Sequence, residues 1–81
     1  MSVWRWEYDP DEEHVVGGLP SHVVTEVERL AGELAVLGAD AAEVGVGHKL
    51  RNLAFLDMGL LYFLPVPRQE LIVVVRVTWA G

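Results

Sequence analysis

The residues of this chain best suited to chemistry are the basic ones that follow Arg29, together with a neighbouring histidine. Lys49 and Arg51 stand two positions apart, so an extended strand places both on one face of a sheet. Arg76 joins them if its own strand presents the same side. Ammonium and guanidinium groups hold phosphates through charge-assisted hydrogen bonds, and a guanidinium stabilises charge that develops during attack on phosphorus. The sequence therefore gives Lys49, Arg51 and Arg68 as candidate phosphate-binding residues, and Arg51, Arg76 and His48 as candidate catalytic residues.

A plainer structural interpretation of the same residues stays open. Lys49 and Arg51 then are solvated residues of a sheet face, and Arg68 is a turn residue. His48 is a candidate general base because imidazole titrates near neutral pH, and it stands beside a lysine that would hold the phosphate. No carboxylate is spaced in the sequence to orient it.

Neither a metal site nor a cofactor is expected. The acidic run at 9–13 lacks the later ligands and the central glycine of a calcium-binding loop, and helix capping accounts for it. The segment 45–47 reads GVG and lacks the lysine of a phosphate-binding loop. The chain contains no cysteine, which excludes disulfides, thiol nucleophiles and cysteine-ligated metals.

Composition limits the classes of protein to which the chain can belong. Its 81 residues indicate a single domain over 1–81, and 52% of them are hydrophobic, so some apolar surface is expected to be buried in an oligomer or complex. The formal net charge is −6, so any binding of nucleic acid must depend on a local basic cluster. We find no signal peptide and no apolar run long enough for a bilayer, and we expect a cytoplasmic protein without a membrane partner.

The N-terminal half predicts a strand followed by two helices. Trp4, Trp6 and Tyr8 alternate with polar residues, and we expect their face to pack on helices. Asp9 is the expected cap of a first helix that ends at the glycines 17–18. Ser21 is the expected cap of the main helix, whose apolar stripe recurs at helical spacing until Gly38.

The C-terminal half predicts three strands, over about 49–56, from 60 to the proline at 65, and over 71–79. In the last strand we expect the odd-numbered residues from Leu71 to Trp79 to face the helices, and Ile72, Val74 and Arg76 to face away. The whole order predicts an α+β fold with an N-terminal strand, a helical hairpin and a three-stranded antiparallel meander.

This layout resembles the RelE/ParE superfamily of bacterial toxins. The residues WEYDPDEEHVVGGLP resemble the family's first strand and capped helix, HKLRNL resembles the segment that opens its second strand, and GLLYFLPVPRQELIVVVRVTW resembles its last two strands. The resemblance implies the toxin component of a toxin–antitoxin system, an antitoxin as protein partner, and cleavage of mRNA on the ribosome by basic side chains of the sheet. The same cluster offers a second use, the binding of an acidic antitoxin segment.

The sequence also departs from the family in ways that favour another function. Leu60 and Leu61 stand where the family has a basic residue, and the segment after KLR is shortened. Whether the chain is an enzyme is therefore open. The alternative is a non-catalytic interaction module on the same scaffold, which forms a homodimer or binds a partner protein.

Overall fold

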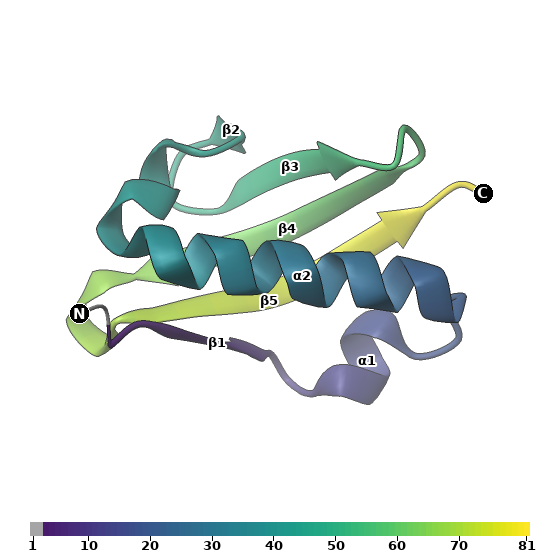
Figure 1. Ribbon diagram of the computed structural model, residues 1–81, viewed down its shortest axis with the longest axis horizontal. Helices are drawn as coiled ribbons and strands as arrows, with labels where there is room; N and C mark the ends of the chain where they lie inside the picture. Colours follow the sequence, from purple (N-terminus) through teal and green to yellow (C-terminus); the bar gives the residue numbers. More distant parts are fainter. Residues whose placement is uncertain (1–2) are drawn as a thin grey trace.

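The computed structural model describes residues 3–81 as two layers, a long helix lying across one face of a twisted sheet (Figure 1). The α+β class expected from the sequence is confirmed. In chain order, the elements are β1 (Arg5–Tyr8), α1 (Glu12–Val16), α2 (Ser21–Leu37), the 3-10 helix η1 (Gly38–Glu43), β2 (Val46–Gly47), β3 (Arg51–Phe55), β4 (Gly59–Val66), the 3-10 turn η2 (Pro67–Gln69) and β5 (Leu71–Trp79).

The strands form one mixed sheet in the order β1-β5-β4-β3-β2. β3, β4 and β5 pair antiparallel, and β2 adds a two-residue strand at the edge. β1 lies beside β5 and runs parallel to it, so the first and last strands of the chain are neighbours (Figure 1). β5 is thus the strand between the parallel and antiparallel parts of the sheet.

Both helix starts differ from the expectation. Asp11, rather than Asp9, caps α1, and its carboxylate accepts a hydrogen bond from the backbone N–H of His14 at 2.9 Å. Asp9 instead extends the strand pairing, because its N–H donates to the carbonyl of Val74 at 3.0 Å. Pro20, rather than Ser21, occupies the cap position of α2, which has no side-chain cap.

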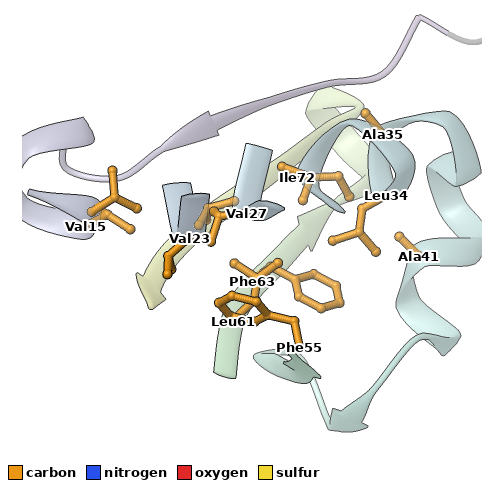
Figure 2. Packing of buried hydrophobic residues seen from close by; sticks show 13 residues of the cluster. Val15, Val23, Val27, Leu34, Ala35, Ala41, Phe55, Leu61, Phe63 and Ile72 are labelled. Carbon is orange, nitrogen blue, oxygen red and sulfur yellow. The ribbon is translucent and has the colours of Figure 1, made fainter. Parts of the chain in front are cut away.

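The core lies between α2 and the sheet (Figure 2). Helical spacing places an apolar stripe of α2 against the strands. Large apolar side chains of the sheet pack against this stripe and are buried. The fully or almost fully buried members include Val23, Val27, Ala31, Leu34, Ala41, Leu61, Phe63, Ile72 and Val74. Trp6 and Tyr8 of β1, and Trp4 just before it, are half-buried and pack against this cluster.

A β-bulge in β5 overturns the predicted division of that strand. Tyr62 pairs with Arg76, but the next residue, Phe63, pairs with Val74, so Val75 is an extra residue. Before the bulge the even-numbered Ile72 and Val74 therefore enter the core. After it the odd-numbered residues face the helices as expected.

The sheet surface away from α2 is called the open face below. The register and the alternation of side chains assign it Leu60, Tyr62, Leu64 and Val66 of β4, and Leu71, Val73, Val75, Arg76 and Thr78 of β5. Arg5 and Glu7 of β1, Asn52 and Ala54 of β3, and Val46 of β2 complete it.

Candidate functional site

A hollow lies at a step in the sheet, where β4 continues past β3. The pairing of the two strands ends at Arg51 and Phe63, so the last three residues of β4 extend beyond β3. The bend at 48–50 and the 3-10 helix η1 approach this free edge. The hollow has a volume of about 540 Å³ and is lined by Ala42, His48, Lys49, Arg51, Leu64, Pro65, Val66, Pro67 and Arg68. We call it the basic hollow.

The basic hollow brings together four of the residues chosen from the sequence. Lys49 and His48 come from the bend between β2 and β3, Arg51 opens β3, and Arg68 comes from η2. Lys49 lies in the bend and not on the strand, so it does not share a strand face with Arg51, as its spacing had predicted.

Arg51 is held by the loop that it closes. Its Nε donates to the carbonyl of Val44 at 2.6 Å, its Nη1 to the carbonyls of Gly47 and His48 at 2.8 and 3.3 Å, and its Nη2 to that of Gly45 at 2.9 Å. These contacts use four of the five N–H groups of a guanidinium. Gly45 and Gly47 have φ of 74° and 132°, which lets the loop wrap around the side chain. Arg51 is therefore fixed in position and keeps one N–H for a ligand.

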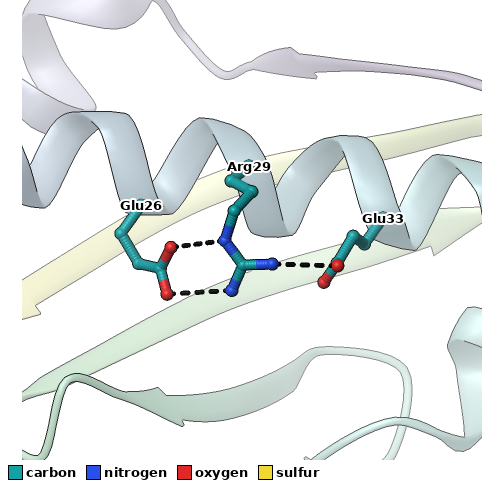
Figure 3. A network of polar contacts seen from close by, with 3 residues as sticks. All are labelled: Glu26, Arg29 and Glu33. Atoms are coloured by element: carbon teal, nitrogen blue, oxygen red, sulfur yellow. Dashed lines mark hydrogen bonds and ion pairs between the residues drawn. The ribbon is translucent and has the colours of Figure 1, made fainter.

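The cations of the basic hollow have no carboxylate partner. Over residues 3–81, the ion pairs within 4.0 Å join His14 to Asp11, and Arg29 to Glu26 and Glu33. The second of these networks lies along the solvent side of α2 (Figure 3). Lys49 and Arg68 are exposed. A local excess of positive charge therefore exists in a chain whose formal net charge is −6.

Arg76 lies apart from this group. It is exposed on the open face, where its guanidinium carbon is 5.7 Å from the ring centre of Tyr62. Arg51 pairs with Phe63, a core residue, and so stands on the helix side of the sheet. The three candidate catalytic residues are thus divided, with His48 and Arg51 at the hollow and Arg76 on the other face.

The arrangement is suited to binding an anion that carries an apolar or flat group. Lys49 and Arg68 present unpaired donors, while Leu64, Pro65 and Pro67 supply an apolar wall. A nucleotide has this combination of phosphate, sugar and base. The apolar wall was not expected from the sequence, in which the PVP segment was interpreted only as a turn. The one sequence feature that could have indicated it is the presence of prolines directly before an arginine.

Other features of the described residues add no second site. Over residues 3–81, no group of three or more His, Asp and Glu side chains is placed to hold a metal ion. No helix in this part of the chain has both the length and the apolar character needed to cross a membrane. The ring of His22 packs edge-on against Trp79, with 5.8 Å between ring centres, and His14 bonds to Asp11 at 2.8 Å.

The chain has no significant match among protein-family models, curated proteins or solved structures.

Proposed function

We propose that this chain is a RelE/ParE-like toxin component that binds RNA phosphates in the basic hollow. The observation that carries the proposal is the convergence of Lys49, Arg51 and Arg68 with His48 on one hollow, with no carboxylate within ion-pair distance of the three cations. Unpaired cations that gather in an acidic chain indicate an anionic ligand. The order of strand, helices and antiparallel strands supports the same scaffold.

Each residue of the hollow has a role in this proposal. Lys49 and Arg68 hold the phosphates on either side of the reacting bond. His48 removes the proton from a ribose 2′-hydroxyl, and the 2′-oxygen then bonds to the adjacent phosphorus while the bond from phosphorus to the 5′-oxygen of the next nucleotide breaks. The products are a 2′,3′-cyclic phosphate and a 5′-hydroxyl, whose proton comes from water. The remaining N–H of Arg51 stabilises charge on the phosphate oxygens, and its carbonyl cage keeps that donor in place before the substrate binds. A protein antitoxin would hold the toxin inactive.

The test is inducible expression in bacteria without any partner. We expect growth to slow and mRNA half-lives to shorten for the unchanged chain. The double variant Lys49→Ala/Arg68→Ala should remove both effects. Arg29→Ala is the matched control, because Arg29 lies on the solvent side of α2 and should leave toxicity intact. Unimpaired growth with stable mRNA at high expression would refute the proposal.

A second candidate is the non-catalytic interaction module, and one observation favours it. Four of the five N–H groups of Arg51 already bind backbone carbonyls, and Arg76 lies on the opposite face. A module of this kind would bind its partner with the same affinity after Lys49→Ala/Arg68→Ala, and its expression would leave growth unchanged. The expression experiment therefore separates the two functions.

A further inference from the structure

We propose that the open face is a homodimer interface, on which a second copy of this chain packs sheet against sheet. Leu64 and Val66 belong both to the open face and to the wall of the basic hollow. The proposal does not use the cations of the hollow, because it depends on the apolar side chains and the charge distribution of the open face. Within residues 3–81 of the single chain, no α-helix packs on the open face, and the second copy would cover it.

The first argument is the composition of the two central strands. An antiparallel sheet with one face in water normally alternates apolar and polar residues. β4 and β5 are instead apolar on both faces. Their half-buried open-face members are Leu60, Leu64, Val66, Val73 and Val75, beside Tyr62, Arg76 and Thr78, whereas Leu71 is already buried within the single chain. Val46 of β2 is a further apolar residue of this face, separated from β4 by Asn52, and is 71% exposed. A continuous apolar surface of this kind on a small protein is typical of an interface.

The second argument is where the charge lies. The helical segments α1, α2 and η1 together contain seven carboxylates and one guanidinium, which amounts to the whole formal charge of −6. The open face carries only Arg5, Glu7 and Arg76. Packing two open faces together therefore points the acidic layers outwards and away from each other. A strongly charged partner would meet almost no opposite charge on the open face, whereas a second copy presents the same apolar surface.

The third argument is area. Seven residues of strand at about 3.3 Å each and four strands at about 4.8 Å give a flat projection of roughly 450 Å² per copy. Two copies give roughly 900 Å², and the accessible surface of corrugated side chains is larger than its projection. This approaches the roughly 1,000 Å² that a specific interface requires and indicates a small, reversible dimer. The charges on this face include both signs, so a two-fold arrangement can place Arg5 or Arg76 of one copy near Glu7 of the other.

The first test is the molar mass in solution by sedimentation equilibrium, over a roughly hundredfold range of concentration. We expect the unchanged chain to form a dimer that dissociates on dilution. Val73→Glu should weaken the dimer at least about tenfold, because it buries a carboxylate in the apolar interface. Val36→Glu is the matched control, since Val36 is 77% exposed on α2, and it should dimerise as the unchanged chain does. A monomer at every concentration would overturn the proposal.

The second test does not depend on a variant that changes the apolar surface. The chain has no cysteine, so Ala54→Cys, on the exposed part of the open face, gives a single site for a spin label. The labelled chain is mixed with ¹⁵N-labelled chain that carries no spin label. We expect intermolecular broadening of the amide signals of β4 and β5. Broadening confined to α2, or no intermolecular broadening in a sample that sediments as a dimer, would place the contact elsewhere and contradict the proposal.

Discussion

Arg51 and Arg76 lie on opposite faces of one sheet, although their partners on β4 are the adjacent residues Phe63 and Tyr62. The alternation of β4 sends Phe63 into the core and Tyr62 to the open face, and each arginine follows its partner. Arg51 consequently meets the loop at 44–48, whereas Arg76 meets the ring of Tyr62. One arginine thus belongs to the basic hollow and the other to the open face.

Replacement of Arg51 should destabilise the protein more than replacement of any other basic residue described. Arg51→Ala leaves the carbonyls of Val44, Gly45 and Gly47 without their donor, and such losses cost roughly 1–3 kcal/mol of unfolding free energy. Arg29→Ala removes two ion pairs at the surface of α2 and should have a clearly smaller effect. Urea denaturation of both variants measures the difference. Equal stabilities would show that the loop does not depend on Arg51.

Two glycines should respond to alanine with opposite signs. A Cβ on Gly59 would lie 2.5 Å from the ring of Phe55, so Gly59→Ala must displace a buried aromatic side chain and should cost roughly 1–3 kcal/mol. Gly32 lies inside α2 with nothing within 4 Å of its Cβ position. Gly32→Ala should therefore stabilise the protein by up to about 1 kcal/mol. Thermal unfolding of the two variants checks both signs, and a neutral Gly59→Ala would contradict the packing described.

The Asp11–His14 pair should make the start of α1 dependent on pH. The hydrogen bond with His14 lowers the pKa of Asp11, and the same bond and the carboxylate charge raise the pKa of His14. The contribution of Asp11 is present above its unfolded pKa and disappears as pH falls. That of His14 is present below its unfolded pKa near 6.5 and disappears as pH rises through the folded value. The pair should therefore stabilise α1 most between about pH 4 and 6.5.

The measurement is an NMR titration of the His14 ring in the unchanged chain and in Asp11→Asn. We expect the pKa of His14 to fall in the variant, because both named causes of its rise involve the Asp11 carboxylate. The His22 signal serves as an internal control, since that ring contacts Trp79. An unchanged His14 pKa in Asp11→Asn would show that the pair does not form in solution.

The sequence predicted the class and the strand β5 well, but not the faces of β5. Its last strand was expected at 71–79, which is where it lies. Seven of its nine residues are apolar, so the pattern contains no information on which side is buried, and nothing in it signals the bulge at Val75. Spacing within one strand determines which of its residues share a face of the sheet. The relation of Arg51 to Arg76 also depends on the register between β3, β4 and β5 and on the bulge in β5, which the sequence does not reveal.

The candidate site was predictable in its residue types but not in its grouping. Lys49 and Arg68 are 19 positions apart in the sequence. They line the same hollow because β4 extends past the end of β3 and the bend at 48–50 lies over the unpaired edge of β4. No local pattern encodes where one strand stops beside another. The cap of α1 was not predictable for a similar reason. Asp9 and Asp11 are both favourable cap residues. The hydrogen bond between the N–H of Asp9 and the carbonyl of Val74 holds Asp9 in the sheet, and Asp11 is left to cap the helix.

The most direct test of the basic hollow is an NMR titration of the folded protein with a short single-stranded RNA. We predict shifts of the amide signals at 48–51 and of Leu64, Val66 and Arg68, with affinity that falls as salt rises, because each phosphate contact releases counterions. Arg68→Ala should weaken binding several-fold, whereas Arg76→Ala should leave it unchanged. No shift at saturating RNA in low salt, or shifts around Arg76 with none at 48–51 and Arg68, would contradict the account.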